Sequence, residues 1–393
     1  MMDFNNTQIA FAHKSPTELR NANLLFNVMK RPGIVRFGKW ASNIAIKVHF
    51  PISWIVKPTI YKQFVGGEAL EDCDKVIAGL EKSGVYAALD YSAECKQTPE
   101  GNECVYQETL RSIDNAARNK RIVYAVFKPS TLTTDEVLAK SSEAPETMTA
   151  EEKKEYEKFV ERFMGLCQRA YDNDVRILVD AEDVCFQVTL DKLTDEAMRK
   201  YNKKRAIVFA TLQMYRHDRM PYLEAIYKDA VENDYIAGVK FVRGAYMEEE
   251  RKRAAEKGYP DPICKDKPAT DANFDAGVEY VLEHIDRMEL FIGTHNEESC
   301  YKAARIIDEK GIERGDSRIY FAQLHGMSDH ITFNLADAGY GVLKYVPYAR
   351  VKDVLPYLIR RAEENTSVEG QTLRELTMIK TEKARRKAAG ASK

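Results

Sequence analysis

Two adjacent arginines late in the chain are the first candidates for chemistry. Arg360 and Arg361 stand in the segment LPYLIRRAEEN, residues 355–365, whose apolar and aromatic residues predict a helix with one buried face. Adjacent guanidinium groups repel each other and are costly to bury, so one interpretation is that both point into water. The alternative is that they bind an anion, above all a carboxylate, which a guanidinium holds through two parallel hydrogen bonds. This segment alone favours exposure to solvent.

Eight short apolar segments are the elements that would have to position such side chains. Each is mostly apolar, as a strand covered on both faces should be, and each is followed by a segment of helical pattern. Eight such units in about 290 residues predict an α/β protein with a (β/α)8 barrel. An open doubly wound sheet is the alternative, but no G-x-G-x-x-G motif follows an early strand. The predicted strands lie in residues 85–91, 121–130, 175–182, 205–213, 237–246, 288–296, 318–326 and 341–348.

Charged, amide and aromatic residues gather at the ends of these predicted strands, where barrel enzymes place their active sites. Each has a plainer interpretation, such as a solvated ion, a glycine required by a turn, or a histidine satisfied at a turn. A purely structural barrel needs no such collection, so together they indicate a site at one rim. In chain order they are Asp90, Tyr91, Glu94, Lys128, Asp180, Glu182, Gln213, Arg243, Gly244, Tyr246, Thr294, His295, Asn296, Leu324, His325, Tyr345 and Tyr348.

Composition and spacing argue against several other classes of protein. The formal net charge is -2, which gives no support to a global role in nucleic-acid binding. None of the 7 cysteines forms a CxxC pair, and neither HExxH nor a histidine pair at i, i+4 occurs, so we predict reduced thiols and no metal. No apolar run reaches the roughly 18 residues of a membrane span, and residues 1–15 resemble neither a signal nor a transit peptide. We therefore expect a cytoplasmic protein.

The first part of the chain has an unusual charge pattern. No acidic residue occurs between Glu18 and Glu68, where the average composition would place about eight. Eight basic residues and both tryptophans, Trp40 and Trp54, fall in residues 19–67, which we name the basic arm. A basic, partly amphipathic segment with tryptophans is typical of contact with an anionic membrane surface. The alternative is a helical arm that packs on the main domain with its charges solvated.

We predict three regions: a basic helical N-terminal arm (1–70), a catalytic barrel (71–375) and a basic C-terminal tail (376–393) that we expect to be frayed. Two insertions interrupt the barrel rhythm. The polar insertion 138–159 contains a helix start, with Thr149 as N-cap and Glu152 three residues later. The insertion 257–271 contains three prolines, which predicts a loop.

Several long motifs then point to one family. GVKFVRGAYMEEER, LFIGTHN, LHGM, KYVPY and PYLIRRAEENTS occur in this order, and residues 65–370 resemble the proline dehydrogenase family. The resemblance implies a distorted (β/α)8 barrel that binds FAD. It also implies oxidation of L-proline to Δ1-pyrroline-5-carboxylate by hydride transfer from C5 to flavin N5, with a membrane quinone as electron acceptor. No segment resembles the aldehyde dehydrogenase half of bifunctional relatives, so we expect a monofunctional enzyme.

The resemblance also assigns roles to residues. It implies a catalytic set of Lys128, Asp180, Lys240, Arg360 and Arg361. Lys128 and the two arginines would hold the substrate carboxylate, and Glu94 would pair with the second arginine. The remaining substrate contacts implied are Tyr246, Leu324, Tyr345 and Tyr357. The flavin contacts implied are Gln213, Lys240, Val242, Arg243, Gly244, Thr294, His295, Asn296 and Glu364.

Some features depart from the family pattern or leave alternatives open. Lys240 and Arg243 stand in the order of monofunctional eukaryotic-type members, which leaves the placement of the cation near N5 open, and Ala349 replaces a glycine. Family members that oxidise hydroxyproline have a smaller residue at position 345, so Tyr345 favours proline, with 4-hydroxyproline as the alternative. A Schiff-base lyase that uses Lys128 and a non-catalytic amino-acid-binding barrel are the rival functions. A quinone acceptor would place the basic arm at the inner face of the cytoplasmic membrane.

Overall fold

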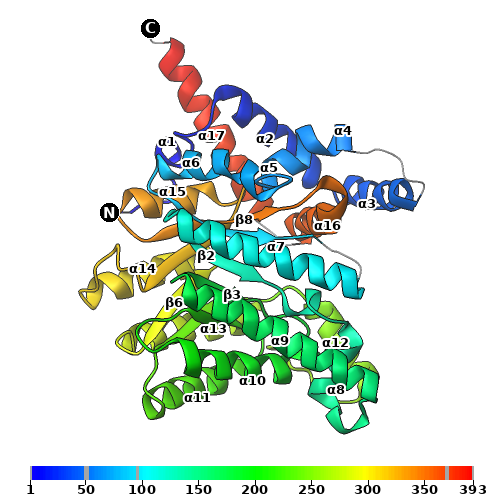
Figure 1. The fold of residues 1–393 in the computed structure, drawn as a ribbon. Coiled ribbons are helices and arrows are strands. Elements are labelled where there is room, and N and C mark those ends of the chain that lie inside the picture. Colours follow the sequence, from blue (N-terminus) through cyan, green and yellow to red (C-terminus); the bar gives the residue numbers. More distant parts are fainter. Residues whose placement is uncertain (1, 48–52, 94–96, 368–370, 392–393) are drawn as a thin grey trace. The chain divides into compact units, whose positions relative to one another are not determined.

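The computed structural model describes residues 2–47, 53–93, 97–367 and 371–391 (Figure 1). Parallel strands follow one another in the order β1 to β8 and form a closed barrel, which confirms the predicted (β/α)8 fold. The strands are β1 (Tyr86–Tyr91), β2 (Ile122–Phe127), β3 (Arg176–Val179), β4 (Val208–Gln213), β5 (Ala237–Val242), β6 (Met288–Gly293), β7 (Ile319–Leu324) and β8 (Val342–Tyr348).

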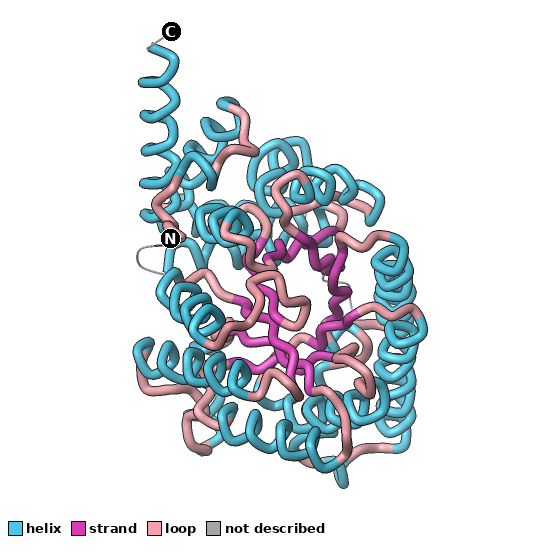
Figure 2. Tube along the Cα trace, turned by 90° about the vertical axis from the view of Figure 1, so that its left-hand side faces the viewer, coloured by secondary structure: helices cyan, strands magenta, loops and turns pink. Residues whose placement is uncertain are grey.

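Helices alternate with the strands along the chain, as the cyan and magenta segments of Figure 2 show. Before β1 lie α1 (Thr7–Ala10), α2 (Pro16–Met29), α3 (Pro32–Lys47), α4 (Ser53–Val56), the π-helical turn η1 (Lys57–Tyr61), α5 (Lys62–Phe64), η2 (Leu70–Cys73) and α6 (Asp74–Glu81). Between the strands lie α7 (Pro99–Arg118), η3 (Pro129–Thr131), α8 (Asp135–Glu143), η4 (Pro145–Thr147), α9 (Ala150–Asp172), α10 (Val184–Tyr201), α11 (Arg219–Glu232), α12 (Met247–Lys257), α13 (Lys267–Glu283), α14 (Glu297–Glu309) and α15 (Asp329–Asp337). After β8 come α16 (Val351–Ser367) and α17 (Gln371–Ala391). No helix within the described ranges is long and apolar enough to cross a membrane.

Every predicted strand segment contains an observed strand, and most of the differences lie at the carboxyl ends, although β4 also begins three residues later than predicted, at Val208. The segments 121–130, 175–182, 237–246, 288–296 and 318–326 each extend past the last strand residue. The extra residues are polar or precede a turn, and they form the loops that follow the strands. These loops hold most of the residues that the sequence marked for chemistry.

The two insertions differ in how well they were predicted. Thr149 caps α9, because its side chain accepts from the Glu152 N–H while the Glu152 carboxylate accepts from the Thr149 N–H, as predicted. The loop prediction for 257–271 is wrong at its end, because α13 already begins at Lys267. Asp266 caps this helix by accepting from the Ala269 N–H at 2.8 Å, and a proline is favourable in the first turn of a helix.

The prediction of a frayed C-terminal tail is also wrong, because α17 continues to Ala391. Glu382 is fully buried on this helix and accepts hydrogen bonds from Arg385 (2.7 Å), Arg386 (2.6 Å) and the hydroxyl of Thr7 (3.0 Å). The basic residues that suggested a solvated tail therefore surround one buried carboxylate, which fastens the helix.

The chain divides into two compact units, and each has its own organisation. Unit 1 comprises residues 1–94 and 323–393, and unit 2 comprises residues 95–322. In unit 1, β1 pairs with β8 from Tyr86↔Leu343 to Tyr91↔Tyr348. The Tyr61 hydroxyl donates to the Ala349 carbonyl at 2.8 Å, which ties the helical turn of the arm to the end of β8.

The alanine at position 349, where the family pattern has a glycine, is not strained. Ala349 is not among the described non-glycine residues with positive φ.

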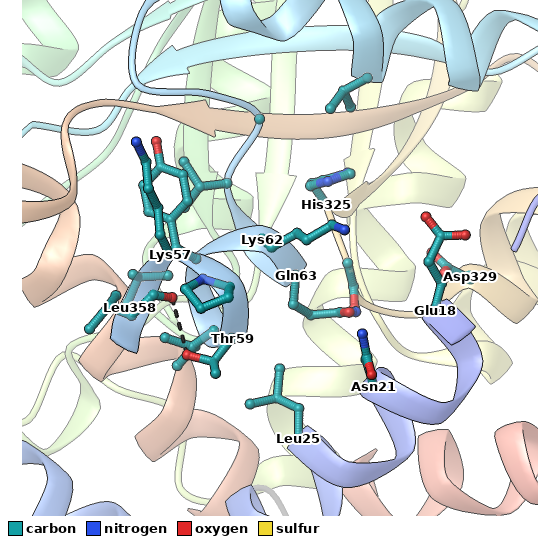
Figure 3. Close-up of a pocket in the computed structure, with 18 of the residues that line it drawn as sticks. Glu18, Asn21, Leu25, Lys57, Thr59, Lys62, Gln63, His325, Asp329 and Leu358 are labelled. Atoms are coloured by element: carbon teal, nitrogen blue, oxygen red, sulfur yellow. Dashed lines mark hydrogen bonds between the residues drawn. The ribbon is translucent and has the colours of Figure 1, made fainter. Parts of the chain in front are cut away.

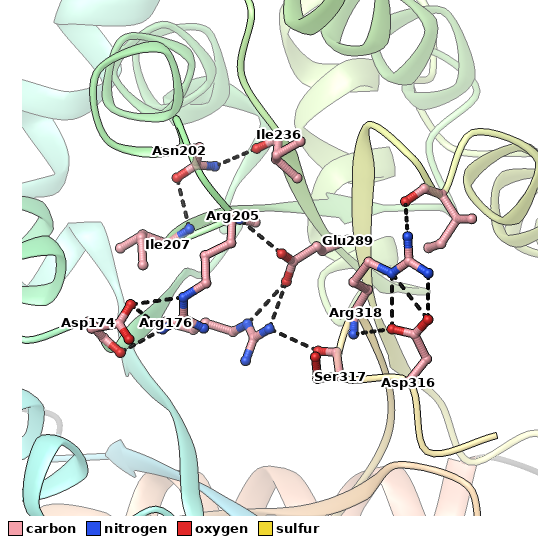
Figure 4. A network of polar contacts seen from close by, with 12 residues as sticks. Asp174, Arg176, Asn202, Arg205, Ile207, Ile236, Glu289, Asp316, Ser317 and Arg318 are labelled. Atoms are coloured by element: carbon pink, nitrogen blue, oxygen red, sulfur yellow. Dashed lines mark hydrogen bonds and ion pairs between the residues drawn. The ribbon is translucent and has the colours of Figure 1, made fainter. Parts of the chain in front are cut away.

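In unit 2, an ion pair closes the amino-terminal end of the strands. The guanidinium of Arg176 on β3 donates to the Glu289 carboxylate on β6 at 2.9 Å, and to the Ser317 carbonyl (Figure 4). The second Glu289 oxygen accepts from the Ala206 N–H at 3.0 Å. Both charges are buried, and each has the partners that make burial tolerable.

An aromatic layer lies next to this ion pair. The Tyr124 ring meets Phe209 and Phe291 edge-on at centroid distances of 5.2 and 5.3 Å, and it meets Tyr320 at 5.8 Å. The Arg176 guanidinium lies 5.8 Å from the Tyr124 ring centroid. Since side chains alternate along a strand, the residues two and four positions further along each strand point to the same side as these rings. On β4 those positions are Thr211 and Gln213, and the register places Lys240 and Val242 of β5 beside them.

Candidate active site

A buried ion pair lies at the carboxyl end of the unit 2 strands. The Lys240 ammonium on β5 donates to the Asp180 carboxylate, which directly follows β3, at 2.5 Å. Lys240 is only 5% exposed, and its ammonium lies 5.6 Å from the Phe291 ring centroid. The register pairs Thr211 with Lys240, so β4 lies between the two partners. Asp180 therefore fixes a cation that the barrel interior would otherwise disfavour.

Lys128 and Glu182 follow the neighbouring strand ends. The Asp180 N–H donates to the Phe127 carbonyl at 3.1 Å, which brings Lys128 to the level of Asp180. The Glu182 carboxylate is buried and accepts from the Ser130 N–H (2.7 Å) and the Ser130 hydroxyl (2.5 Å). Burial raises the pKa of Glu182 to about 7, although the Ser130 hydrogen bonds and the Lys128 charge act in the opposite direction. Near neutral pH this carboxyl group is thus poised between its two forms.

Arg243, directly after β5, is held by three partners. Its guanidinium donates to the Asp271 carboxylate (2.7 Å), the Thr294 hydroxyl (2.6 Å) and the Ser299 hydroxyl (3.0 Å). The Thr294 hydroxyl in turn accepts from the Asn296 N–H at 3.1 Å, and Asn296 caps α14. The arginine therefore joins the ends of β5 and β6 to α13, with its charge in a fixed place.

Gly244 has a backbone that other residues would not adopt. Its φ is +130°, and a Cβ at this position would meet the Tyr215 ring at 2.5 Å. The glycine expected to allow a close approach to a cofactor is thus required first by the packing of Tyr215. Tyr246, two residues later, is half-buried at the start of α12.

Two buried polar atoms on β4 make this site suitable for a heterocyclic cofactor. The side-chain carbonyl oxygen of Gln213 and the Thr211 hydroxyl are buried and have no hydrogen-bond partner among the described residues. They are two residues apart and point to the same side of the strand. Buried polar atoms are rarely left without a partner. A flavin ring offers both N–H donors and oxygen acceptors, so these residues fit FAD.

The remaining predicted site residues belong to unit 1. Tyr345 and Tyr357 are buried, and Leu324 is half-buried. Arg360 and Arg361 are half-buried on α16, and the Arg361 guanidinium lies 5.3 Å from the Tyr357 ring centroid. Neighbouring residues on an α-helix point about 100° apart, so the two arginines leave the helix in different directions. Glu94 and the side chain of Glu364 lie outside the described part of the chain.

The structure thus brings some predicted residues together and adds others. It pairs Lys240 with Asp180 and Arg243 with Thr294. Val242 and His295 stand beside these residues at the ends of β5 and β6. Sequence reasoning missed Ser130, Asp271 and Ser299, which fix Glu182 and Arg243. Asp271 had a usable signal: it follows Lys267 by four residues, a spacing that favours an ion pair on a helix, and the two side chains lie 2.5 Å apart.

The strand order and the charged groups after β3, β5 and β6 define a (β/α)8 barrel with a polar site at its strand ends. The sequence model of the proline dehydrogenase family matches residues 73–374, and the chain belongs to that family.

Three similar proteins can be compared with this chain, and two of them are named as proline or hydroxyproline dehydrogenases. The chain is 33% identical over 327 residues to the carbapenem antibiotics biosynthesis protein CarD of Pectobacterium carotovorum, covering 83% of this chain and 84% of CarD. It is 40% identical over 245 residues to human mitochondrial proline dehydrogenase 1, covering 62% of this chain and 41% of the human protein. It is 30% identical over 412 residues to hydroxyproline dehydrogenase of Xenopus laevis, covering 96% of this chain and 88% of that protein.

A solved structure shares the fold. Proline utilization A (PutA) from Bdellovibrio bacteriovorus, inactivated by N-propargylglycine, aligns with a TM-score of 0.69 at 18% sequence identity. The alignment covers 93% of this chain and 37% of PutA. The chain therefore spans less than half the length of PutA and of the human relative.

The raised pKa of Glu182 predicts a specific pH dependence of stability. A carboxyl group whose folded-state pKa lies above its unfolded value of 4.5 stabilises the fold below pH 4.5, and this contribution is lost as the pH rises to about 7. Glu182→Gln should remove this loss, so the free energy of unfolding of the variant should gain on wild type between pH 5 and 8 by about 1.4 kcal/mol per unit of pKa shift. Urea unfolding across this range measures the difference. Glu256→Gln, on an exposed residue of α12, is the matched control and should follow the wild-type curve. Parallel curves for wild type and Glu182→Gln would contradict the assignment.

Proposed function

We propose that this chain is an FAD-dependent proline dehydrogenase that oxidises L-proline to Δ1-pyrroline-5-carboxylate and passes the electrons to a membrane quinone. The observation that supports this most strongly is the family match, because residues 73–374 include every predicted substrate and cofactor residue. When bound, FAD supplies the oxidant that takes the hydride from C5 of proline. The chain itself binds and orients the substrate and sets the charges around it.

In unit 1, we assign Arg360 and Arg361 to the substrate carboxylate. A guanidinium binds a carboxylate with two parallel hydrogen bonds, and the Tyr357 ring restrains the Arg361 guanidinium before substrate arrives. Tyr345, Tyr357 and Leu324 offer apolar surface, which the carbon ring of proline requires. Arg360→Lys or Arg361→Lys keeps the charge but loses the planar fork, so this role would raise KM more than it lowers kcat.

In unit 2, we assign Lys128 to the carboxylate as a point charge and Asp180 to the positioning of Lys240. Lys240, held at 2.5 Å by Asp180, places a fixed positive charge on the strand next to the buried Gln213 and Thr211 oxygens. A fixed cation in a site shielded from water stabilises negative charge that develops during the reaction. Gln213, Val242, Arg243, Gly244, Tyr246, Thr294, His295, Asn296 and, in unit 1, Glu364 complete the proposed cofactor and substrate contacts, with Glu94 as the partner of Arg361.

The visible absorption spectrum of the purified protein tests this function directly. We expect a flavin band that bleaches when L-proline is added without oxygen or another acceptor, and that does not bleach with D-proline. A band that L-proline leaves unchanged would contradict the substrate assignment. A colourless protein after reconstitution with FAD would contradict the cofactor assignment. Trapping of a carbonyl substrate on Lys128 by borohydride would instead support the lyase alternative.

4-Hydroxyproline is the second candidate substrate. It is favoured by the similarity to Xenopus hydroxyproline dehydrogenase over 96% of this chain. Against it stands the bulk of the buried Tyr345. Bleaching by trans-4-hydroxy-L-proline at a rate equal to that of L-proline would decide for the second candidate.

We also propose that the basic arm places the protein on an anionic membrane surface, at the inner face of the cytoplasmic membrane. Phe37, Trp40 and Trp54 are 64%, 60% and 66% exposed, and the Phe37 and Trp40 rings lie 5.6 Å apart on α3. Arg36 and Lys39 are exposed on the same helix. Exposed aromatic rings beside basic side chains are typical of helices that lie in the membrane interface.

Co-sedimentation with vesicles tests the arm. Phe37→Ser/Trp40→Ser should lower the bound fraction on vesicles rich in phosphatidylglycerol by several-fold, and added salt should weaken the wild-type binding. Leu373→Ser is the matched control, because Leu373 is equally exposed at 60% but lies on α17, outside the arm. Equal binding by all three proteins, insensitive to salt, would contradict the proposal.

A further inference from the structure

Unit 1 contains a large cavity whose lining includes none of the predicted substrate residues in the described part of the chain. Its volume is ≈ 1550 Å³, which exceeds the roughly 300–1,000 Å³ of an ordinary small-molecule site. α16 contributes Leu355, Leu358 and Ile359 to its wall, whereas Tyr357 and Arg361 point elsewhere from the same helix. The cavity is therefore separate from the residues that we assign to proline.

The cavity is apolar over most of its wall. Leu25 and Met29 of α2, Val76 and Leu80 of α6, and Ile60 of η1 face it together with the leucines of α16. Leu24, Val28 and Ile34 also line it while they remain 60%, 45% and 41% exposed, so its rim is apolar and open to solvent. An open apolar rim beside the exposed rings of α3 suits a ligand that carries a long hydrocarbon chain.

One side of the cavity is charged. There Lys14 and Lys344 share a single carboxylate, that of Asp329, at 2.6 and 2.9 Å. In the view of Figure 3, Glu18, His325, Gln63 and Asn21 lie toward the same side of the pocket as Asp329, the Lys62 ammonium points in that direction, and Leu358 and Thr59 lie on another side. Burial, together with the Lys344 charge, lowers the pKa of His325 to about 4, so the imidazole is neutral near pH 7 and adds no charge.

The balance of charge around the cavity is positive. Seven lysines line it against three acidic residues, Glu18, Asp72 and Asp329. The Glu18 carboxylate accepts from the N–H and hydroxyl of Ser15 at 2.8 and 2.7 Å, and Asp72 accepts from two backbone N–H groups. Both carboxylates are thus occupied in helix caps. Lys57 is also paired with Glu68, outside the lining, but the cavity still has more lysines than carboxylates, so an anionic group would find donors and a net positive charge there.

We propose that this cavity binds an anionic amphiphile, with its acyl chain against the apolar wall and its carboxylate or phosphate head among Lys62, Lys14 and Asn21. The site is independent of the proposed proline oxidation. Two sources offer this chemistry, free fatty acids and anionic lipids with one acyl chain. Both have the long chain and the oxyanion that the wall and the lysines require.

Displacement of the fluorescent fatty acid cis-parinaric acid from the full-length protein tests the proposal. We expect saturable binding that is displaced by oleate, lysophosphatidate or both, and the more effective competitor identifies the source. Methyl oleate has the same chain without the charge, and a short-chain quinone is a neutral amphiphile, so both should displace the probe only weakly. Displacement by the neutral compounds at equal concentration would overturn the anionic head. Absence of saturable binding would overturn the site.

Two variants locate the binding. Leu25→Trp puts an indole ring against the apolar wall where we place the acyl chain, and it should weaken the binding of cis-parinaric acid by at least about tenfold. Lys62→Gln removes an exposed lysine of the lining and should weaken oleate several-fold while leaving methyl oleate unchanged. Lys14 and Lys344 stay intact, because their loss would leave Asp329 buried without its partners.

Leu373→Trp, on α17 outside the lining, is the matched control and should bind as wild type. Circular dichroism and proline oxidation report whether each variant is folded. Wild-type affinity in a folded Leu25→Trp protein would contradict the proposal.

Discussion

The ion pair between Lys240 and Asp180 is the interaction on which the candidate site depends. The Lys240 ammonium is buried inside the barrel, 5.6 Å from the Phe291 ring centroid, and Asp180 accepts from it at 2.5 Å. Removing either partner would leave a buried ion unpaired, which costs several kcal/mol. Beside the pair, the buried oxygens of Thr211 and Gln213 on the intervening strand have no partner among the described residues, and burial raises the pKa of Glu182. A polar site with a fixed cation follows from this one contact.

A second buried ion pair lies at the opposite end of the strands in unit 2. Arg176 and Glu289 form a second buried pair, and the rings of Tyr124, Phe209 and Phe291 separate the two polar layers. The Arg176–Glu289 pair also has backbone hydrogen-bond partners and so contributes to stability. The Lys240–Asp180 pair lies beside buried polar atoms that have no partner among the described residues. This difference in hydrogen-bond satisfaction distinguishes the structural end of the barrel from the end that can bind a ligand.

In unit 1, two faces of helix α16 carry side chains with different proposed roles. Leu355, Leu358 and Ile359 recur at the spacing of one helical face and line the cavity. Tyr357 and Arg361, four residues apart, occupy a different face and contact each other. One amphipathic helix can therefore serve both a substrate carboxylate and a lipid-like ligand, and the cavity adjoins the arm for which we propose a membrane contact.

The strands could be predicted from sequence because continuous apolar runs between helical patterns have few other interpretations, as in β4 and β6. The capping box at Thr149 was likewise a local signal. The helix at Lys267 was missed although Asp266 and the proline of its first turn are a local start signal, because the three prolines of the segment favoured a loop. The helical tail was missed because Glu382 is stabilised by Thr7, which is distant in the sequence. The partners of Glu182 and Arg243 were missed for a similar reason: Ser130, Asp271 and Ser299 reach them only through tertiary contacts. The cavity is formed by α2, α6 and α16, which lie far apart along the chain, so no local pattern could indicate it.

A double-mutant cycle on Asp180→Asn and Lys240→Met tests the central claim most directly, with the rate constant of anaerobic flavin reduction by L-proline as the readout. If Asp180 acts by holding Lys240, each single variant should lose roughly 100-fold or more, and the double variant should be no slower than the slower single variant. Losses that multiply in the double variant would show that the two residues act independently and would contradict the account.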